Sequence, residues 1–122
     1  MGLMNITHIR LVTVPVSDQD AAKDFYAGKL GFEVVMDGDA GPIRWLQLAP
    51  KGASTSVVLA DHVPGLAPGS VQGLMLETTG LDADCEELKR AGIDVDGPQD
   101  LPWGRQATFT DPDGNGIVLA EG

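Results

Sequence analysis

The sequence predicts an α+β fold in which two β-α-β-β-β modules form a curved, mostly antiparallel sheet around a concave cup. One observation behind this prediction is that strand-like and helix-like segments occur twice in the same order along the 122 residues. Another is that "LGFEV" at 30–34 resembles "AGIDV" at 91–95. Similarly, "VVLA" at 57–60 resembles "IVLA" at 117–120. The separations of 61 and 60 residues (91 − 30 and 117 − 57) agree, which indicates a duplicated half.

The first module is expected at about 4–60. Its first strand covers 5–17, because this stretch is rich in β-branched residues and has valines at alternate positions near its end. Either Ser17 or Asp18 can cap the helix that follows, and Gly31 ends it. Short strands bounded by Gly, Pro, Asp and Ser complete the module, at 32–36, 43–49 and 56–60.

The second module is expected at about 71–121, after a connector at 61–70 that is rich in proline and glycine. Its predicted elements are a strand at 71–77, a helix at about 81–91, and strands near 93–95, 105–110 and 116–120. A chain of this length is most simply one domain, covering 1–122, with the cup between its modules. Pockets commonly form where structural units meet, so the cup is the expected ligand site.

Composition and charge exclude several classes of partner. Acidic residues exceed basic ones by 18 to 8, and the resulting net charge of −10 opposes binding to nucleic acid or to an anionic membrane surface. We expect a cytoplasmic protein, since no apolar run is long enough to span a bilayer and the single cysteine cannot form an internal disulfide. Cys85 has acidic neighbours, which disfavour a reactive thiolate.

Two stretches carry a family resemblance. "VSDQDAAKDFYAGKLGFEVV" at 16–35 and "FTDPDGNGIVL" at 109–119, together with the doubled element order, resemble the vicinal oxygen chelate superfamily. That superfamily includes glyoxalase I, extradiol dioxygenases, fosfomycin-resistance enzymes and bleomycin-resistance proteins. The resemblance covers nearly the whole chain and implies the fold. It does not fix the function, because one scaffold carries several chemistries.

The resemblance also implies where a metal would bind. In metal-dependent members, His, Glu or Gln ligands occupy cup-facing positions on four strands. Counting from the shared landmarks, these positions fall on Leu11, Val58, Val71 and Val118. None of these aliphatic side chains has a lone pair to offer a cation. We therefore expect no metal and no cofactor, with the four residues lining an apolar cup.

Other candidate ligands and bases leave alternatives open. His8 reaches the first ligand position if the strand contains a bulge. A displaced set that joins His8 to Glu77 or Glu121 would give a metal-dependent glyoxalase-like lyase or dioxygenase. His62 beside Asp61 is a second imidazole, in the connector. A metal-independent isomerase or epimerase is a third possibility, for which the sequence offers no clear base.

Aromatic and polar side chains are the remaining candidates for ligand binding. Alternation places Trp45 and Gln47 on one face of the strand at 43–49, and we expect that face to line the cup. In the second module, we expect Trp103 and Arg105 to line the cup as Trp45 and Gln47 do in the first. An aromatic ring beside a hydrogen-bonding group suits a planar or cationic ligand, but both tryptophans are equally compatible with a core or a dimer interface.

The motif "DPDGN" at 111–115 is interpreted as a turn, in which Gly114 and Asn115 tolerate positive φ. It lacks the further oxygen ligands of a calcium loop. Taken together, the sequence favours a small-molecule binding protein that sequesters a ligand in its cup without a metal, and the resemblance implies a homodimer. The comparison is with bleomycin-resistance proteins, in which an acidic dimer holds a cationic drug.

Overall fold

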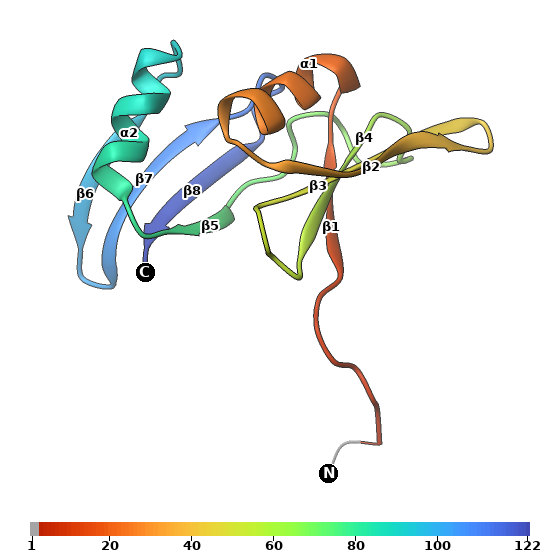
Figure 1. Cartoon of the computed structure of the whole chain (residues 1–122), viewed down its shortest axis with the longest axis horizontal. Helices are drawn as coiled ribbons and strands as arrows, with labels where there is room; N and C mark the ends of the chain where they lie inside the picture. The colour runs from red at the N-terminus through yellow and green to blue at the C-terminus, as the bar shows by residue number, and fades with distance from the viewer. Residues whose placement is uncertain (1–2) are drawn as a thin grey trace.

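The structure, a computed structural model, describes residues 3–122 and shows two four-stranded sheets, each with a helix on one face (Figure 1). The first module contains β1 (Leu11–Pro15), α1 (Gln19–Lys23), the π-helical segment η1 (Asp24–Lys29), β2 (Glu33–Ala40), β3 (Ile43–Ala49) and β4 (Ser56–Ala60). The second contains β5 (Leu74–Thr78), α2 (Leu81–Arg90), β6 (Asp96–Leu101), β7 (Gly104–Thr110) and β8 (Gly116–Glu121). The predicted α+β class and doubled element order are confirmed.

Strand order shows the duplication directly. The sheets have the orders β1-β4-β3-β2 and β5-β8-β7-β6, so each position in one has an equivalent in the other. The β1–β4 and β5–β8 pairs are parallel, and the remaining pairs are antiparallel. The strands are thus mostly antiparallel, as predicted, but each module has a sheet of its own rather than a share of one continuous sheet.

The first strand is shorter than its sequence pattern predicts. β1 begins at Leu11, which pairs with Ser56, the first residue of β4. Upstream of that point the chain has no strand partner within the described residues, so 3–10 form an extended N-terminal arm that projects from the sheet (Figure 1). Four apolar side chains of the N-terminal arm are largely exposed: Leu3 (96%), Met4 (78%), Ile6 (81%) and Ile9 (66%).

The sixth strand also differs from expectation. Ile93 and Val95 were predicted to form it, but they pack against the hydrophobic core before the strand begins at Asp96. β6 has the sequence "DGPQDL", which has low intrinsic strand propensity. It forms because it pairs with β7, through a register shift between Asp96 and Gln99. Tertiary pairing therefore overrides local propensity here.

Residues from both modules contribute to one hydrophobic core. The helix-facing side chains of the two sheets join Phe25 and Tyr26 from η1 and Leu81 and Leu88 from α2. The rings of Phe25 and Phe109 lie 6.2 Å apart between centroids, so an aromatic contact crosses from one module to the other. The N-terminus of α1 is capped by Asp18, whose Oδ1 accepts the Ala21 N–H at 3.1 Å.

The loop at 111–115 connects the modules through buried hydrogen bonds. Asp111 is 4% exposed, and its Oδ2 accepts the Tyr26 hydroxyl at 2.9 Å and Asn115 Nδ2 at 2.8 Å. Asn115 is 1% exposed; its Nδ2 also donates to the Pro15 carbonyl at 2.8 Å, and its Oδ1 accepts the Val71 N–H at 3.1 Å. The loop therefore ties β1 and η1 of the first module to the segment that precedes β5 in the second.

This arrangement corrects one part of the turn interpretation. Gly114 has φ of 94°, as a turn glycine is expected to have. No residue other than glycine has positive φ in the described part of the chain, so Asn115 does not use that freedom. Asparagine is required at 115 because its side chain both donates and accepts hydrogen bonds.

The Tyr26 hydroxyl provides a test of this buried network. Burial, followed by the nearby Asp111 carboxylate, raises the pKa of Tyr26 far above its usual value of about 10. Above pH of about 10 the unfolded chain loses the phenolic proton while the folded protein keeps it. We therefore expect stability to be unaffected by this group below pH of about 10 and to fall above it, approaching about 1.4 kcal/mol for each pH unit.

Urea unfolding at a series of alkaline pH values measures this slope, and Tyr26→Phe is expected to reduce it. Tyr26 is also the single tyrosine of the chain, so tyrosinate absorbance reports on it alone. The absorbance should rise only as the circular dichroism of the fold is lost. Tyrosinate that appears near pH of about 10 in a fully folded protein would contradict the raised pKa.

Candidate functional site

Each sheet has one face against the helices and one face turned away, which we call the open face. On β3, Leu46 and Leu48 are fully buried in the core on the helix side. Strand alternation therefore places Trp45 and Gln47 on the open face, as predicted. Both side chains are half-buried, so they remain accessible to a ligand.

The open face of the first sheet carries a row of hydrogen-bonded polar groups. Trp45 Nε1 donates to Gln47 Oε1 at 2.9 Å, and Gln47 Nε2 donates to Ser56 Oγ at 2.7 Å. The Ser56 hydroxyl lies 3.4 Å from the Arg10 carbonyl oxygen, to which it donates. These bonds fix the indole and the amide relative to β4, so this face presents a pre-oriented aromatic ring rather than a mobile one.

Three of the four residues at the expected metal positions lie on the open faces. Leu11 pairs with Ser56, and Val58 is paired with Gln47, all with side chains on the same face. In the second sheet, Val118 pairs with Met75. These three side chains offer no lone pair to a metal, and the Gln47 amide beside Val58 is already hydrogen-bonded to Trp45 and Ser56.

Val71 lies elsewhere than predicted. It precedes β5, and its backbone is held by Asn115 Oδ1 and by the Gly116 N–H, which donates to the Val71 carbonyl. The side chain next to Val118 on β5 is Met75, which is 59% exposed. The sequence count missed Met75 because it assumed a strand that begins three residues earlier than the observed one.

The donor set does not fit a catalytic metal. Within residues 3–122, no group of three His, Cys, Asp or Glu side chains lies close enough together to hold an ion. His8 belongs to the exposed N-terminal arm, where its Nδ1 lies 2.9 Å from the Thr7 hydroxyl. Glu77 and Glu121 are on opposite faces of their sheet, since Glu121 turns to the helix side and pairs with Arg105 at 3.3 Å.

The other titratable candidates are also separate from the open faces. His62 Nδ1 lies 3.5 Å from Asp61 Oδ1 in the connector, so the two neighbours do form a pair. Cys85 is buried in α2, and that burial raises the pKa of its thiol, which keeps it in the unreactive form. Neither residue contacts the row formed by Trp45, Gln47 and Ser56.

Arg105 lies on the helix side of its sheet rather than on the open face. Its guanidinium pairs with Asp82 at 3.0 Å, Asp100 at 3.0 Å and Glu121 at 3.3 Å. Hydrogen bonds from Arg105 lower the pKa of Asp82. The register of β7 therefore makes Arg105 a clamp between its sheet and the first turn of α2, and removes it from the predicted ligand set.

Arg44 forms the equivalent clamp in the first module. It pairs with Asp20 in the first turn of α1 at 2.7 Å and with Asp37 on β2 at 2.8 Å. Hydrogen bonds from Arg44, and next from Lys23, hold the pKa of the Asp37 carboxyl well below its usual range. Arg44 and Arg105 are thus matching residues of the duplication, and both have structural partners.

Trp103 lies in the hairpin between β6 and β7 and is 73% exposed. Its Nε1 donates to Gln106 Oε1 at 3.1 Å, much as Trp45 donates to Gln47 in the first module. Each module therefore displays an indole fixed by a glutamine.

A cavity of about 370 Å³ opens on the second sheet, where sequence reasoning identified only one of its residues. Val118 and Thr108 lie side by side in its wall, and Asp94 and Asp96 contribute carboxylates. The full lining is Gln72, Gly73, Asp94, Asp96, Thr108, Phe109, Thr110, Gly116, Ile117 and Val118. The aspartates were missed because the strand was expected at 93–95, and its position depends on pairing with β7.

Among residues 3–122, no helix has the length and apolar character needed to cross a bilayer.

Comparison with known proteins identifies the family to which this chain belongs. Residues 5–119 match the profile of the Glyoxalase/Bleomycin resistance protein/Dioxygenase superfamily. The protein YetH of Bacillus subtilis is 36% identical over 95% of this chain and 99% of its own length. Over most of their lengths, therefore, the two sequences correspond.

Solved structures give the same result. TnmS3, an antibiotic binding protein from a Streptomyces species, is 54% identical, with 97% of this chain and 98% of that chain covered at a TM-score of 0.94. A superfamily member from Sphaerobacter thermophilus is 37% identical, with 96% and 98% covered at a TM-score of 0.89. The resemblance read from the sequence is confirmed, and the chain belongs to the Glyoxalase/Bleomycin resistance protein/Dioxygenase superfamily.

Proposed function

We propose that this protein binds and sequesters a cationic small molecule on its open faces, without a metal ion and without chemical turnover. The observation that carries the proposal is the cavity on the second sheet. Its lining combines the apolar Val118 with the carboxylates of Asp94 and Asp96, and no lysine or arginine is among these described lining residues. Such a site favours a ligand with a positive charge beside an apolar body.

Charge and similarity support the same proposal. The net charge of −10 attracts cations and repels anions over the whole surface. TnmS3, which resembles this chain over nearly its full length, is described as an antibiotic binding protein. Leu11, Val58 and Val118 offer no lone pairs for a metal, and Met75, which lies beside Val118, offers only a thioether sulfur. Binding is therefore better supported than metal-assisted catalysis.

The proposal includes a cytoplasmic location, which the single cysteine favours. It also includes a homodimer. Trp45 and Gln47 lie half-buried on an open face, above the buried Val58, and all three are absent from the lining of the cavity described above. A second copy of the chain would supply a wall opposite this face and complete the cup. The exposed apolar side chains of the N-terminal arm supply contact area for such a partner.

Isothermal titration calorimetry with metal-free bleomycin tests the binding proposal. We expect saturable binding that a chelator leaves unchanged. The double variant Asp94→Asn, Asp96→Asn should weaken it at least tenfold, about 1.4 kcal/mol, because two charge-assisted contacts to the ligand are removed. The matched control is Asp24→Asn, Asp39→Asn, which makes the same charge change at exposed positions outside the cavity.

Two outcomes would overturn this function. Equal loss of affinity in both double variants would show that only overall charge matters and that the cavity is not the site. A tightly held divalent ion, or turnover of a glyoxalase or dioxygenase substrate that the chelator abolishes, would support the metal-dependent alternative instead.

A further inference from the structure

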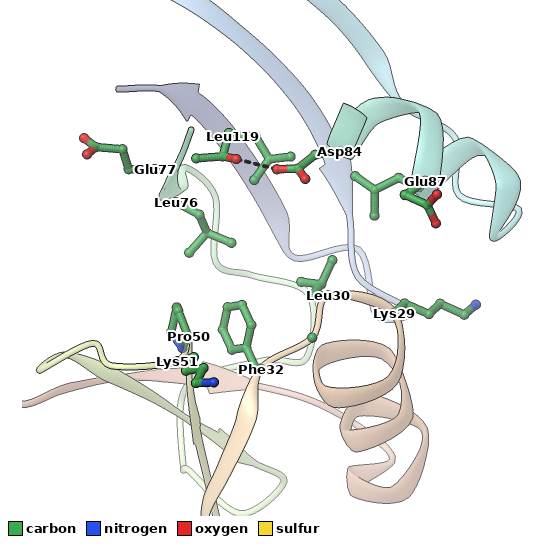
Figure 2. Close-up of a pocket in the computed structure, with 13 residues that line it drawn as sticks. Lys29, Leu30, Phe32, Pro50, Lys51, Leu76, Glu77, Asp84, Glu87 and Leu119 are labelled. Atoms are coloured by element: carbon green, nitrogen blue, oxygen red, sulfur yellow. Dashed lines mark hydrogen bonds between the residues drawn. The ribbon is translucent and has the colours of Figure 1, made fainter. Parts of the chain in front are cut away.

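A second cavity lies between the two modules, on the helix side of the sheets. Its volume is about 270 Å³. Figure 2 shows it bounded below by the first module, through Leu30 and Phe32, and above by the second module, through Leu76 and Leu119. Since Leu76 and Leu119 face the core rather than the open face, this cavity is distinct from the one proposed for the cationic ligand.

The centre of this inter-module cavity is apolar. Phe32 is 8% exposed, Leu88 4% and Leu119 7%, so these side chains are well fixed by the surrounding core. Leu30 and Leu76 are only half-buried, and they expose apolar surface toward the gap. In Figure 2, Leu76 and Phe32 point toward one another across it. Surface of this kind gains free energy when an apolar group covers it.

Charged groups other than Asp84, which is half-buried in the upper wall, occur at the margins of the inter-module cavity. Lys51 and Glu77 lie toward one side in Figure 2, and Lys29 and Glu87 lie toward the other. Within residues 3–122, no ion pair involves Lys29, Lys51 or Glu77. Glu87 is paired with Arg90, so Lys29, Lys51 and Glu77 are the unpaired groups of the described lining that a ligand reaching the margin can contact.

The balance of these groups indicates a ligand without net charge. Glu87 is already paired with Arg90, which leaves Lys29 and Lys51 against the carboxylates of Glu77 and Asp84. Asp84 also accepts the Thr78 hydroxyl at 2.5 Å. A charged group carried into the apolar centre, among Leu30, Phe32 and Leu76, would lose its hydration. A volume of about 270 Å³ lies just under the usual range for drug-sized ligands, which limits the occupant to a compact molecule.

We propose that the inter-module cavity is a second small-molecule site that takes a compact, uncharged aromatic molecule with a hydroxyl or carbonyl group at each end. The rings would contact Leu30, Phe32 and Leu76, and the polar ends would exchange hydrogen bonds with the lysines and glutamates at the margins. This site lies beyond the proposed sequestration function and does not depend on it.

A titration with a dihydroxynaphthalene that carries one hydroxyl on each ring tests this site. Binding is monitored by NMR of the leucine and valine methyl groups. We expect saturable shifts at the methyl groups of Leu30, Leu76 and Leu119, with the methyl groups of Val58 and Val118 unaffected. Leu76→Trp should weaken binding at least tenfold because the indole fills the cavity. Met75→Trp, one residue away on the open face of the same strand, is the matched control and should bind as the wild type does.

The rim offers variants that leave the core intact. The double variant Lys51→Gln, Glu77→Gln, with both changes at exposed positions, should weaken binding of the dihydroxynaphthalene severalfold. It tests the inter-module site if Leu76→Trp proves unfolded by circular dichroism. No saturable binding, shifts confined to Val58 and Val118, or unchanged affinity in the rim pair would overturn the proposal. Bleomycin binding in the Leu76→Trp protein is measured alongside, so failure here is distinguishable from failure of the open-face function.

Discussion

Replacing Asn115 by alanine is expected to lower the free energy of unfolding by about 3 kcal/mol, measured by urea denaturation. The side chain is 1% exposed and forms three hydrogen bonds, to the Pro15 carbonyl, the Val71 N–H and the Asp111 carboxylate. Alanine leaves the part-buried Val71 N–H and one acceptor site of the buried Asp111 carboxylate without a partner. Each such group costs about 1 to 3 kcal/mol.

The reason for so large an effect is that Asn115 joins segments far apart in the chain. Its bond to Pro15 spans 100 positions, and its bond to Val71 spans 44. Ser17→Ala is a suitable control, because Ser17 donates to Asp113 in the same loop at 2.6 Å but is exposed. That control should change stability by less than about 1 kcal/mol. Equal effects in the two variants would show that Asn115 is not the connecting residue.

Removal of the N-terminal arm before Arg10 is expected to convert the proposed dimer into a monomer. Leu3, Met4, Ile6 and Ile9 are each at least 66% exposed in the single chain. Burial of one such side chain against a partner is worth about 1.5 to 3 kcal/mol before the cost of ordering is counted. Their loss should weaken dimerisation at least 100-fold, about 2.7 kcal/mol, as seen by light scattering across a dilution series.

The same variant separates assembly from folding. Because the N-terminal arm contacts the fold mainly through the Ile9 and Arg10 carbonyls, the truncated monomer should retain its circular dichroism spectrum. A full-length variant with serine at the four apolar positions is the control for chain length, and it should dissociate in the same way. A truncated protein that remains dimeric would place the interface on another surface.

The sequence predicts the fold well because its signals are local and repeated. The helix at 81–91 and the strands at 43–49, 56–60 and 116–120 were each placed within one residue of the observed ends. These segments combine alternating or helical apolar spacing with clear turn residues on both sides. The repeated pairs of short sequences then fix the order of the second module from that of the first.

The prediction is weaker where pairing partners decide the outcome. The pattern at 5–17 is strand-like throughout, but β1 covers only Leu11–Pro15, the residues that pair with β4. The rest of the pattern has no partner strand among residues 3–122 to satisfy its backbone groups. β6 shows the opposite case, a sequence with Gly97 and Pro98 that becomes a strand through β7. Neither effect is visible in the residues concerned, since each depends on a segment elsewhere in the chain.

The site was predicted in part for the same reason. Trp45 and Gln47 lie on the open face because alternation within one strand is a local property. Arg105 was grouped with Trp103 by spacing alone, and the register of β7 turns it to the helix side. Asp94 and Asp96 escaped notice because their role depends on a cavity that residues from four separate segments enclose.

The paired arginine clamps have a consequence for how this scaffold changes over evolutionary time. Arg44 and Arg105 fasten each helix to its own sheet, and they alternate along their strands with residues that face the opposite way. Mutations at the positions that face away from the helices therefore leave the helix-facing positions, including the two arginines, undisturbed. Selection can vary the ligand-facing side chains of a strand while the neighbouring residue preserves the architecture, so new binding specificities are accessible without intermediates that fail to fold.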